Sequence, residues 1–278
     1  MVCLIGSLSV LKASGFVFIF QFAIDMGLYA QTLFYPMGDR GLLIEFGDEI
    51  SREINEKVRR MALAVQDEIR EGIVEVVPTY RSLLIIHNPL LLPVAELKKR
   101  LRRIEQALQK APLPEPELTR IPAVYGGIYG PDLEGVAKYH QISPEKVIQL
   151  HCSKAYLIYM IGFMPGYPYM GELPDELLTP RLKTPRLVVP KGSVAIAQRQ
   201  TGIYSMESPG GWQIIGRTPV ELFDPARNPP SLLRMGDLVQ FYEISEKEFR
   251  EWHSTTHPQF QMPKLKCQTN AKVQRQNE

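Results

Sequence analysis

The stretch from Gly162 to Thr218 constrains the fold of this chain more than any other feature. It holds eight of the chain's 20 glycines and seven of its 23 prolines. Glycine permits backbone conformations that are closed to other residues, whereas proline fixes φ and removes a hydrogen-bond donor. Short apolar runs lie between these residues, a spacing typical of short strands joined by shaped loops: Leu187 to Val189, Val194 to Ala197 and Gln213 to Ile215. The stretch therefore predicts an all-β unit whose loops build a concave surface.

The overall composition describes an ordinary globular chain with room for about two domains. Of its 278 residues, 45% are hydrophobic and 22% are charged. The formal net charge is +2, but the last 24 residues carry four basic residues against one acidic residue, so residues 1–254 carry about −1. Such a body offers no basic surface for nucleic acid, and we expect no nucleic-acid partner.

The cysteines and histidines favour neither a disulfide framework nor a metal site. Cys3, Cys152 and Cys267 are an odd number of thiols, far apart and without CxxC spacing. A reducing cytoplasm is the simplest compartment for such a chain. The five histidines show no metal-ligand spacing either, so the sequence predicts no metal.

An apolar run near the N-terminus is the one feature that points towards a membrane. Ala13 to Ile24 is uncharged and flanked by Lys12 and Asp25, but twelve residues are short of the roughly 20 that span a bilayer. The run also lacks the basic n-region and cleavage site of a signal peptide. We interpret residues 1–33 as a non-essential extension or as the product of a start codon assigned too early, with Met26 as the true start. Export or membrane tethering is the alternative.

Residues 34–115 show the order of a small α+β sandwich. A hairpin turning at Gly38 to Gly41 is followed by a helix with Ser51 as N-cap and Gly72 as its C′ residue. Strands at 73–77 and 83–87 come next, and a second helix carries apolar residues at helical spacing from Val94 to Leu108. Its basic run, Lys98 to Arg103, is interpreted as a solvated helix face, with a docking patch as the alternative. The order is therefore ββαββα.

A proline-rich connection around residues 112–116 predicts a domain boundary near residue 115. Beyond it we expect a strand at 119–125, a helix at 132–139, and another helix with Ser143 as N-cap and Pro144 at its first position. A strand at 155–161 then enters the glycine-rich and proline-rich stretch. The resulting division is 34–115 and 116–250, followed by a polar basic tail at 251–278.

No catalytic motif is complete in this sequence. His151 and Cys152 are adjacent on a helix and point about 100° apart, so they form no dyad. Ser208 lacks the G-x-S-x-G elbow, and the chain has no phosphate-binding G-x-x-x-x-G-K-[ST] loop. Charged groups among aromatic rings, however, are typical of small-molecule pockets. The candidate catalytic residues are His151, Glu207 and Arg217, and the candidate substrate-binding residues are Phe163, Gln200, Thr201, Tyr204 and Trp212.

Structural roles compete with these functional ones. Trp212 suits core packing as well as a ligand platform, and Arg217 suits a brace between loops. His151 is as consistent with a hydrogen-bonded polar group at the end of a helix as with a member of a site. The sequence leaves these alternatives open.

Several long, ordered motifs carry a resemblance to a known family: EVVPTYRSLLI, PAVYGGIYGPDLEGVA, GFMPGYPYMG, TPRLKTPRLVVPKGSVAIA and QTGIYSMESPGGWQIIGRTP. Over roughly residues 34–245 the chain resembles the family that contains the B subunit of 5-oxoprolinase, the sporulation-kinase inhibitor KipI and allophanate hydrolase subunit 1. The resemblance implies an N-terminal α+β domain followed by a cyclophilin-like β-barrel. Residues 1–33 and the tail lie outside it.

The resemblance also implies a function. It implies ATP-dependent hydrolysis of 5-oxo-L-proline to L-glutamate by a 5-oxoprolinase complex. In that complex this chain joins a KipA-like C subunit and an A subunit, and without them it is expected to be inactive. Since the chain shows no nucleotide-binding motif, ATP is expected on a partner or at a shared interface. Two alternatives stay open: an inhibitor that binds a histidine kinase, and hydrolysis of allophanate.

Overall fold

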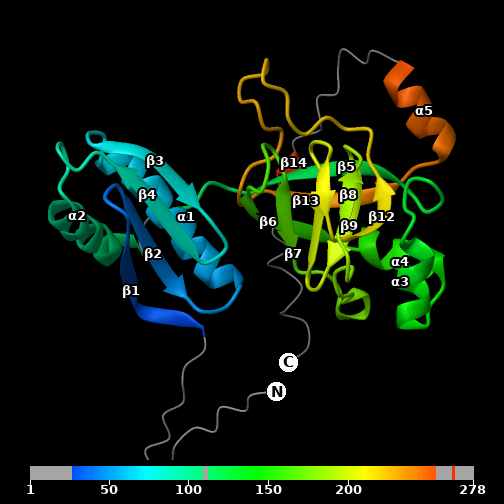
Figure 1. The fold of residues 1–278 in the computed structure, drawn as a ribbon, viewed down its shortest axis with the longest axis horizontal. Coiled ribbons are helices and arrows are strands. Elements are labelled where there is room, and N and C mark those ends of the chain that lie inside the picture. Colours follow the sequence, from blue (N-terminus) through cyan, green and yellow to red (C-terminus); the bar gives the residue numbers. More distant parts are fainter. Residues whose placement is uncertain (1–26, 109–111, 255–264, 267–278) are drawn as a thin grey trace, which may run out of the picture.

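The computed structural model describes residues 27–108, 112–254 and 265–266 of the chain. Within them the chain forms a four-stranded sheet covered by helices, followed by a larger sheet that closes on itself. Figure 1 shows these two parts beside one another, in blue to green and in green to orange. We call them the N-terminal unit and the barrel.

The N-terminal unit has the predicted ββαββα order. Its elements are β1 (Leu28–Met37), β2 (Gly41–Gly47), α1 (Arg52–Glu68), β3 (Ile73–Pro78), β4 (Ser82–His87) and α2 (Val94–Ala107). The strands are antiparallel in the order β1-β2-β4-β3. Apolar side chains of β2, β4 and both helices form one buried core, among them Leu42, Ile85, Val58 and Leu101. The α+β sandwich is thereby confirmed.

The caps of α1 show where local sequence decided the structure and where it did not. The Ser51 hydroxyl accepts a hydrogen bond from the Ile54 backbone N–H at 3.3 Å, as an N-cap should. The predicted C′ role of Gly72 is wrong, because the C-cap is Ile69. Gly72 instead has a positive φ of 84° before β3, and a Cβ there would lie 2.5 Å from that of Leu92. Close packing, not helix termination, requires this glycine.

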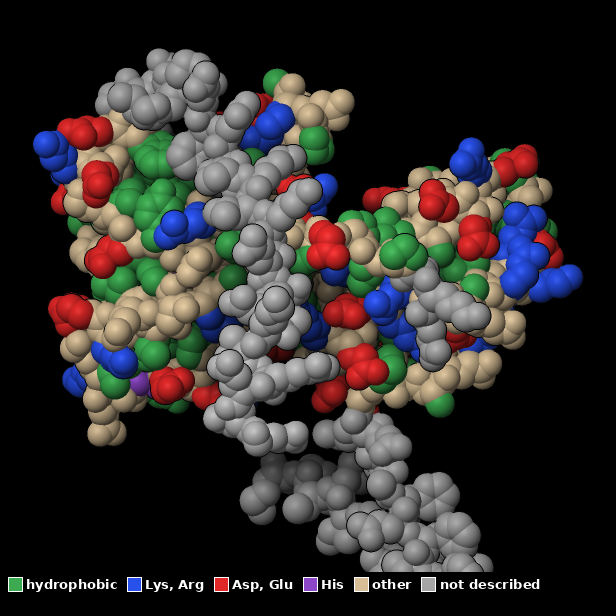
Figure 2. Space-filling view, turned by 180° about the vertical axis from the view of Figure 1, so that it is seen from behind, with side chains coloured by type: hydrophobic (Ala, Val, Ile, Leu, Met, Phe, Trp, Pro, Cys, Tyr) green, Lys and Arg blue, Asp and Glu red, His purple; other side chains and the backbone are tan. Residues whose placement is uncertain are grey.

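The basic run of α2 lies at the outer edge of the N-terminal unit. Figure 2 shows Lys and Arg side chains gathered at that edge. Arg100 and Arg102 pair with carboxylates of the same helix, Glu96 at 3.0 Å and Glu105 at 2.8 Å. Two of the five basic residues of this run are therefore balanced within α2.

The barrel is a continuous sheet in the order β12-β9-β10-β7-β6-β13-β5, closed by the pairing of β12 with β5. Its strands are β5 (Glu117–Tyr125), β6 (Ala155–Ile161), β7 (Pro168–Gly171), β9 (Ser193–Ala197), β10 (Gln200–Ile203), β12 (Gln213–Arg217) and β13 (Leu238–Glu243). All neighbours are antiparallel except β13 and β5, which run parallel. The predicted β-barrel is confirmed. The sequence did not predict β7, β10 or β13, which are short or lack a clear alternating pattern.

Helices and smaller strands complete the barrel. The helices α3 (Leu133–His140) and α4 (Pro144–Cys152) pack apolar residues into the barrel core, and α5 (Glu246–Ser254) follows β13. A small two-stranded sheet of β8 (Arg186–Val189) and β11 (Ser208–Gly210) lies beside the main one, and β14 (Leu265–Lys266) pairs with β5. None of the described helices is long and apolar enough to cross a membrane.

The structure moves two predicted boundaries. Residues 28–33, which the sequence assigned to the extension, belong to β1, and α5 runs past residue 250 into the predicted tail. Residues 1–26, with the apolar run and the proposed start at Met26, lie outside the described residues, as does most of the tail. The division into domains at residue 115 stays a prediction, with α2 ending at Ala107 and β5 beginning at Glu117.

Polar groups of α1 join the N-terminal unit to the barrel. The Asn55 side chain is fully buried, and its amide donates to the Tyr159 carbonyl of β6 at 3.0 Å. Nearby, Arg59 lies against Gly236, where a Cβ would approach the guanidinium carbon to 1.9 Å. Gly236 has a positive φ of 90°, which favours glycine, and a larger residue there would displace the Arg59 guanidinium. The two parts therefore meet through close and specific contacts.

Candidate functional site

A cavity of about 610 Å³ lies between the N-terminal unit and the barrel. We call it the inter-unit cavity. The N-terminal unit contributes two residues to its wall and the barrel contributes the rest: Ile50, Tyr80, Tyr139, Tyr159, Gly171, Glu172, Leu178, Thr179, Pro180, Gln198, Arg199 and Gln200. Aromatic and apolar walls with a few polar groups are typical of small-molecule sites.

Tyr80 is the central residue of this cavity. It sits in the turn between β3 and β4, and its hydroxyl accepts a hydrogen bond from Gln200 Nε2 of β10 at 2.7 Å. Its ring lies 5.7 Å from those of Tyr159 and Tyr169. Burial raises the pKa of Tyr80 far above its ordinary value, so the phenol stays protonated. Sequence reasoning predicted Gln200 but missed Tyr80. The signal for Tyr80 in the sequence was an aromatic residue in a short turn between two predicted strands.

Two charged residues line the cavity, Glu172 and Arg199. Tyr159 donates its hydroxyl to the Glu172 carboxylate at 3.2 Å. Arg199 pairs with Asp175 at 2.9 Å, but both side chains are mostly exposed, at 67% and 75%. Solvent screening makes such a pair weak. The Arg199 guanidinium can therefore exchange its partner for an anionic group of a ligand.

His151 and Thr201 lie together inside the barrel, behind Gln200. Both are fully buried, and His151 Nε2 is 2.9 Å from the Thr201 hydroxyl while Nδ1 is 2.8 Å from the Tyr125 hydroxyl. Because Thr201 can donate its own proton to the Ala195 carbonyl at 3.2 Å, the contacts favour a proton on Nε2. Burial lowers the pKa of His151 to about 3, so the ring is neutral. The catalytic role of His151 stays a prediction. Because both ring nitrogens are hydrogen-bonded inside the barrel, the contacts fit a structural role for the ring.

Tyr204 and Trp212 belong to a buried aromatic cluster of the barrel. Tyr204 is 2% exposed and Trp212 is 5% exposed, and both stand edge-on to Tyr167, at 5.3 and 6.0 Å between ring centres. Gly210 allows this packing, since a Cβ there would lie 2.2 Å from the Tyr204 hydroxyl oxygen. Arg181 covers the outer face of Trp212 at 5.8 Å. The core-packing alternative for Trp212 fits this burial, and substrate binding by either residue stays a prediction.

The structure does not bring the three candidate catalytic residues together. Glu207 is exposed in the loop before β11. Arg217, at the end of β12, donates from Nε to the Lys191 carbonyl at 2.8 Å and lines a separate cavity of about 510 Å³. No hydrogen bond or ion pair joins these side chains to each other or to His151 within the described ranges. Phe163, 63% exposed with a φ of 67°, packs edge-on against Tyr167.

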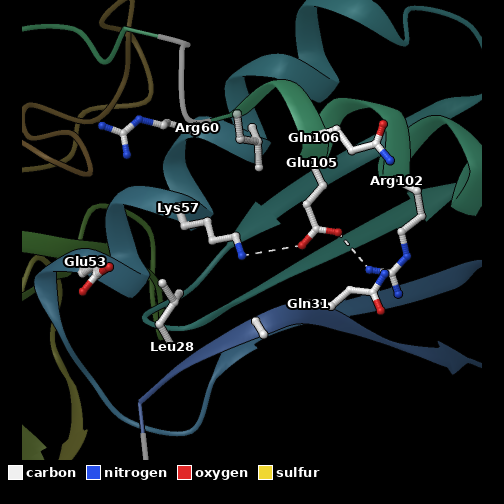
Figure 3. A pocket seen from close by; sticks show the side chains of 10 residues that line it. Leu28, Gln31, Glu53, Lys57, Arg60, Arg102, Glu105 and Gln106 are labelled. Atoms are coloured by element: carbon white, nitrogen blue, oxygen red, sulfur yellow. Dashed lines mark hydrogen bonds and ion pairs between the residues drawn. The ribbon is translucent and has the colours of Figure 1, made fainter. Parts of the chain in front are cut away.

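Another cavity of about 610 Å³ lies within the N-terminal unit (Figure 3). Lys57 and Arg102 both point at the Glu105 carboxylate, at 3.5 and 2.8 Å. Burial opposes ionisation of Glu105, but hydrogen bonds from Thr32 and Arg102 outweigh it and lower the pKa of the carboxyl. These charges satisfy one another and tie β1 to α2, so we place the candidate site in the inter-unit cavity. The described residues contain no group of three or more His, Cys, Asp or Glu placed to hold a metal.

Comparison with known proteins places this chain in a family. Residues 32–233 match the family model of the carboxyltransferase domain, subdomain C and D. The 5-oxoprolinase B subunit of Bacillus subtilis (strain 168) is 39% identical over 230 residues, which cover 78% of this chain and 94% of that protein.

Two solved structures also match this chain. The crystal structure of TTHA0988 is 36% identical with a TM-score of 0.66, and the match covers 74% of this chain but 40% of that chain. This chain therefore spans less than half of that solved protein. The K. lactis urea amidolyase matches with a TM-score of 0.67 at 22% identity, over 88% of this chain and 16% of that one, which shows a shared fold. The resemblance seen in the motifs is confirmed, and the chain belongs to the family of the carboxyltransferase domain, subdomain C and D.

Proposed function

We propose that this chain is the B subunit of an ATP-dependent 5-oxoprolinase, which cleaves 5-oxo-L-proline to L-glutamate. The observation that carries the proposal is the 39% identity to the B. subtilis 5-oxoprolinase B subunit over 94% of that protein's length. The inter-unit cavity supports it, since it offers a mostly apolar site with amide, hydroxyl and charged groups for a small polar substrate.

The chain acts in this proposal as one of several subunits. Its partners are a KipA-like C subunit and an A subunit of the same 5-oxoprolinase, and it is inactive without them. More than half of the TTHA0988 chain lies outside the part that matches this chain, which leaves room there for a further domain. We propose the cytoplasm as the compartment.

ATP binds, in this proposal, on a partner or at an interface with one. Phosphorylation of the lactam oxygen would make the amide carbon a better electrophile for water. For this chain we retain the proposed roles of His151, Glu207 and Arg217 in catalysis and of the predicted residues in substrate binding. Gln200 has the strongest structural support, because its amide lines the cavity and contacts Tyr80.

Reconstitution tests the function directly. The chain is produced together with its A and C partners, and ATP-dependent glutamate release from 5-oxo-L-proline is measured while each of the three chains is left out in turn. Activity that requires all three chains is the expected result. A soluble, assembled complex that releases no glutamate would contradict the proposal, and allophanate hydrolysis and histidine-kinase binding would then be measured instead. The urea amidolyase likeness carries the fold alone and gives the allophanate alternative no further weight.

A further inference from the structure

We infer that the inter-unit cavity binds a lactam that carries a carboxylate, with Tyr80 and Gln200 contacting the amide and Arg199 contacting the carboxylate. The inference rests on the proposed function, which makes 5-oxo-L-proline the ligand. It goes beyond that function because it locates the substrate in this chain and assigns a contact to a residue of the N-terminal unit.

The hydrogen bond between Gln200 and Tyr80 leaves two complementary groups for a ligand. Since Gln200 Nε2 donates to the Tyr80 oxygen, the proton of the Tyr80 hydroxyl remains to be donated elsewhere. Burial raises the pKa of this phenol and so keeps that proton in place. The side-chain carbonyl oxygen of Gln200 accepts no hydrogen bond in the described part of the chain. A lactam offers the matching pair, a carbonyl that accepts and an N–H that donates.

The surroundings of this pair strengthen such contacts. The rings of Tyr159 and Tyr169 lie 5.7 Å from the Tyr80 ring, and Ile50 and Leu178 line the same cavity. Hydrogen bonds in a partly desolvated, apolar setting are stronger than in water, and leaving their partners unpaired is costly. The cavity therefore discriminates in favour of a ligand that satisfies both polar groups.

Arg199 gives the cavity a group for the carboxylate of the ligand. Its pair with Asp175 is exposed on both sides, so exchanging that partner for a ligand carboxylate costs little. The bidentate geometry of a guanidinium suits a carboxylate. The volume of about 610 Å³ leaves room for both ends of the ligand.

Asn55 is the positioning residue of this site. Its single amide nitrogen lies within hydrogen-bond reach of the carbonyls of Thr79 and Tyr80 in the turn, at 3.3 and 3.1 Å, and of Tyr159 in the barrel, at 3.0 Å. The turn that carries Tyr80 is thereby fixed against β6. Asn55 touches no ligand in this arrangement and acts through Tyr80.

Binding to the full chain tests the inference. The dissociation constants of 5-oxo-L-proline and of 2-pyrrolidone, the same lactam without the carboxylate, are measured by isothermal titration calorimetry. Tyr80→Phe and Gln200→Leu are expected to weaken both ligands about five- to tenfold, the value of a hydrogen bond to a neutral group. Arg199→Met is expected to weaken 5-oxo-L-proline alone. Tyr35→Phe, which removes an exposed phenol of the same unit, is the matched control.

A double variant tests the positioning role. If Asn55 acts through Tyr80, Asn55→Ala combined with Tyr80→Phe binds no more weakly than the worse single variant, whereas independent effects would multiply. Multiplied effects would overturn the role of Asn55. A wild-type chain without saturable binding, or a Tyr80→Phe chain that binds like Tyr35→Phe, would overturn the site.

The assembled complex separates this inference from the proposed function. Tyr80→Phe is expected to raise the KM for 5-oxo-L-proline about five- to tenfold with kcat little changed. A complex that releases glutamate with an unchanged KM would sink the inference and leave the function standing. A wild-type complex that releases none would sink the function itself.

Discussion

The buried His151 makes the stability of the barrel depend on pH. Its ring is fully buried, with both nitrogens hydrogen-bonded to hydroxyls, and burial lowers its pKa from 6.5 to about 3. The unfolded chain binds a proton on this ring below its ordinary pKa, and the folded chain does not. Above about pH 6.5 the ring is neutral in both states and this proton does not lower the free energy of unfolding. As the pH falls from 6.5 towards 3, the unfolded chain alone binds the proton, and the free energy of unfolding decreases.

The size of the effect follows from the two pKa values. The full difference corresponds to about 5 kcal/mol between the protonation states, and no discount for solvent is needed at a fully buried site. Between about pH 7 and about pH 5 the wild-type chain is expected to lose about 2 kcal/mol of unfolding free energy through this residue alone. His151→Gln cannot take up that proton, so it lacks this part of the pH dependence, although lost hydrogen bonds lower its stability by about 1 to 3 kcal/mol at neutral pH.

Urea denaturation of both chains at the two pH values provides the assay. Tryptophan fluorescence follows the barrel, because Trp212 lies in its buried aromatic cluster. The unfolding free energy of wild type minus that of His151→Gln should fall by about 2 kcal/mol on going to the lower pH, and it changes sign if it is smaller than that at neutral pH. His140→Gln is the matched control, since that ring is less buried and should change the pH dependence less. An equal pH dependence in wild type and His151→Gln would refute the reasoning.

Three further predictions rest on particular contacts. Gly236→Ala is expected to destabilise the chain by about 1 to 3 kcal/mol, measured by thermal unfolding, because its φ of 90° is strained for a residue with a Cβ and the Arg59 guanidinium would also have to move. Gly135→Ala, with nothing near the added carbon, should cost little or nothing. Asp132→Asn is expected to cost about 1 to 3 kcal/mol in the same assay, because the carboxylate accepts a 2.6 Å hydrogen bond from the Ile214 N–H, and unchanged stability would contradict this. Burial raises the pKa of the Cys152 thiol, so iodoacetamide should label it more slowly than a free cysteine near neutral pH, and rapid labelling by peptide mass spectrometry would contradict this.

Elements governed by local sequence were predictable. Ser51 and Ser143 cap their helices as expected, because an N-cap interaction spans three residues. The hairpin of β1 and β2 and the helices α1 and α2 follow from turn residues and apolar periodicity. β7 and β10 were missed because they have four residues each and hold only a few apolar positions. Their pairing with distant strands, not their own composition, decides that they are extended.

The candidate site was predictable only in part, because it depends on contacts between distant segments. Gln200 and Thr201 are neighbours on β10, yet one lines the inter-unit cavity and the other binds His151 inside the barrel. Strand alternation separates them, and the sequence did not predict β10. Tyr80 lies 120 residues from its partner Gln200, so no local pattern connects them. The burial of His151 likewise depends on how α4 packs on the barrel.

The parallel pairing of β13 with β5 has a consequence for synthesis on the ribosome. β13 also pairs with β6, so it lies between β5 and β6 in the sheet. The ribosome makes β13 late, whereas β5 and β6 are the first two strands of the barrel. Until residues 238–243 emerge, the facing edges of β5 and β6 have no partner there, whereas the N-terminal unit already has its whole sheet. Unpaired strand edges promote association with other chains. During translation the N-terminal unit can therefore fold first, while the barrel sheet keeps an open edge until β13 is made.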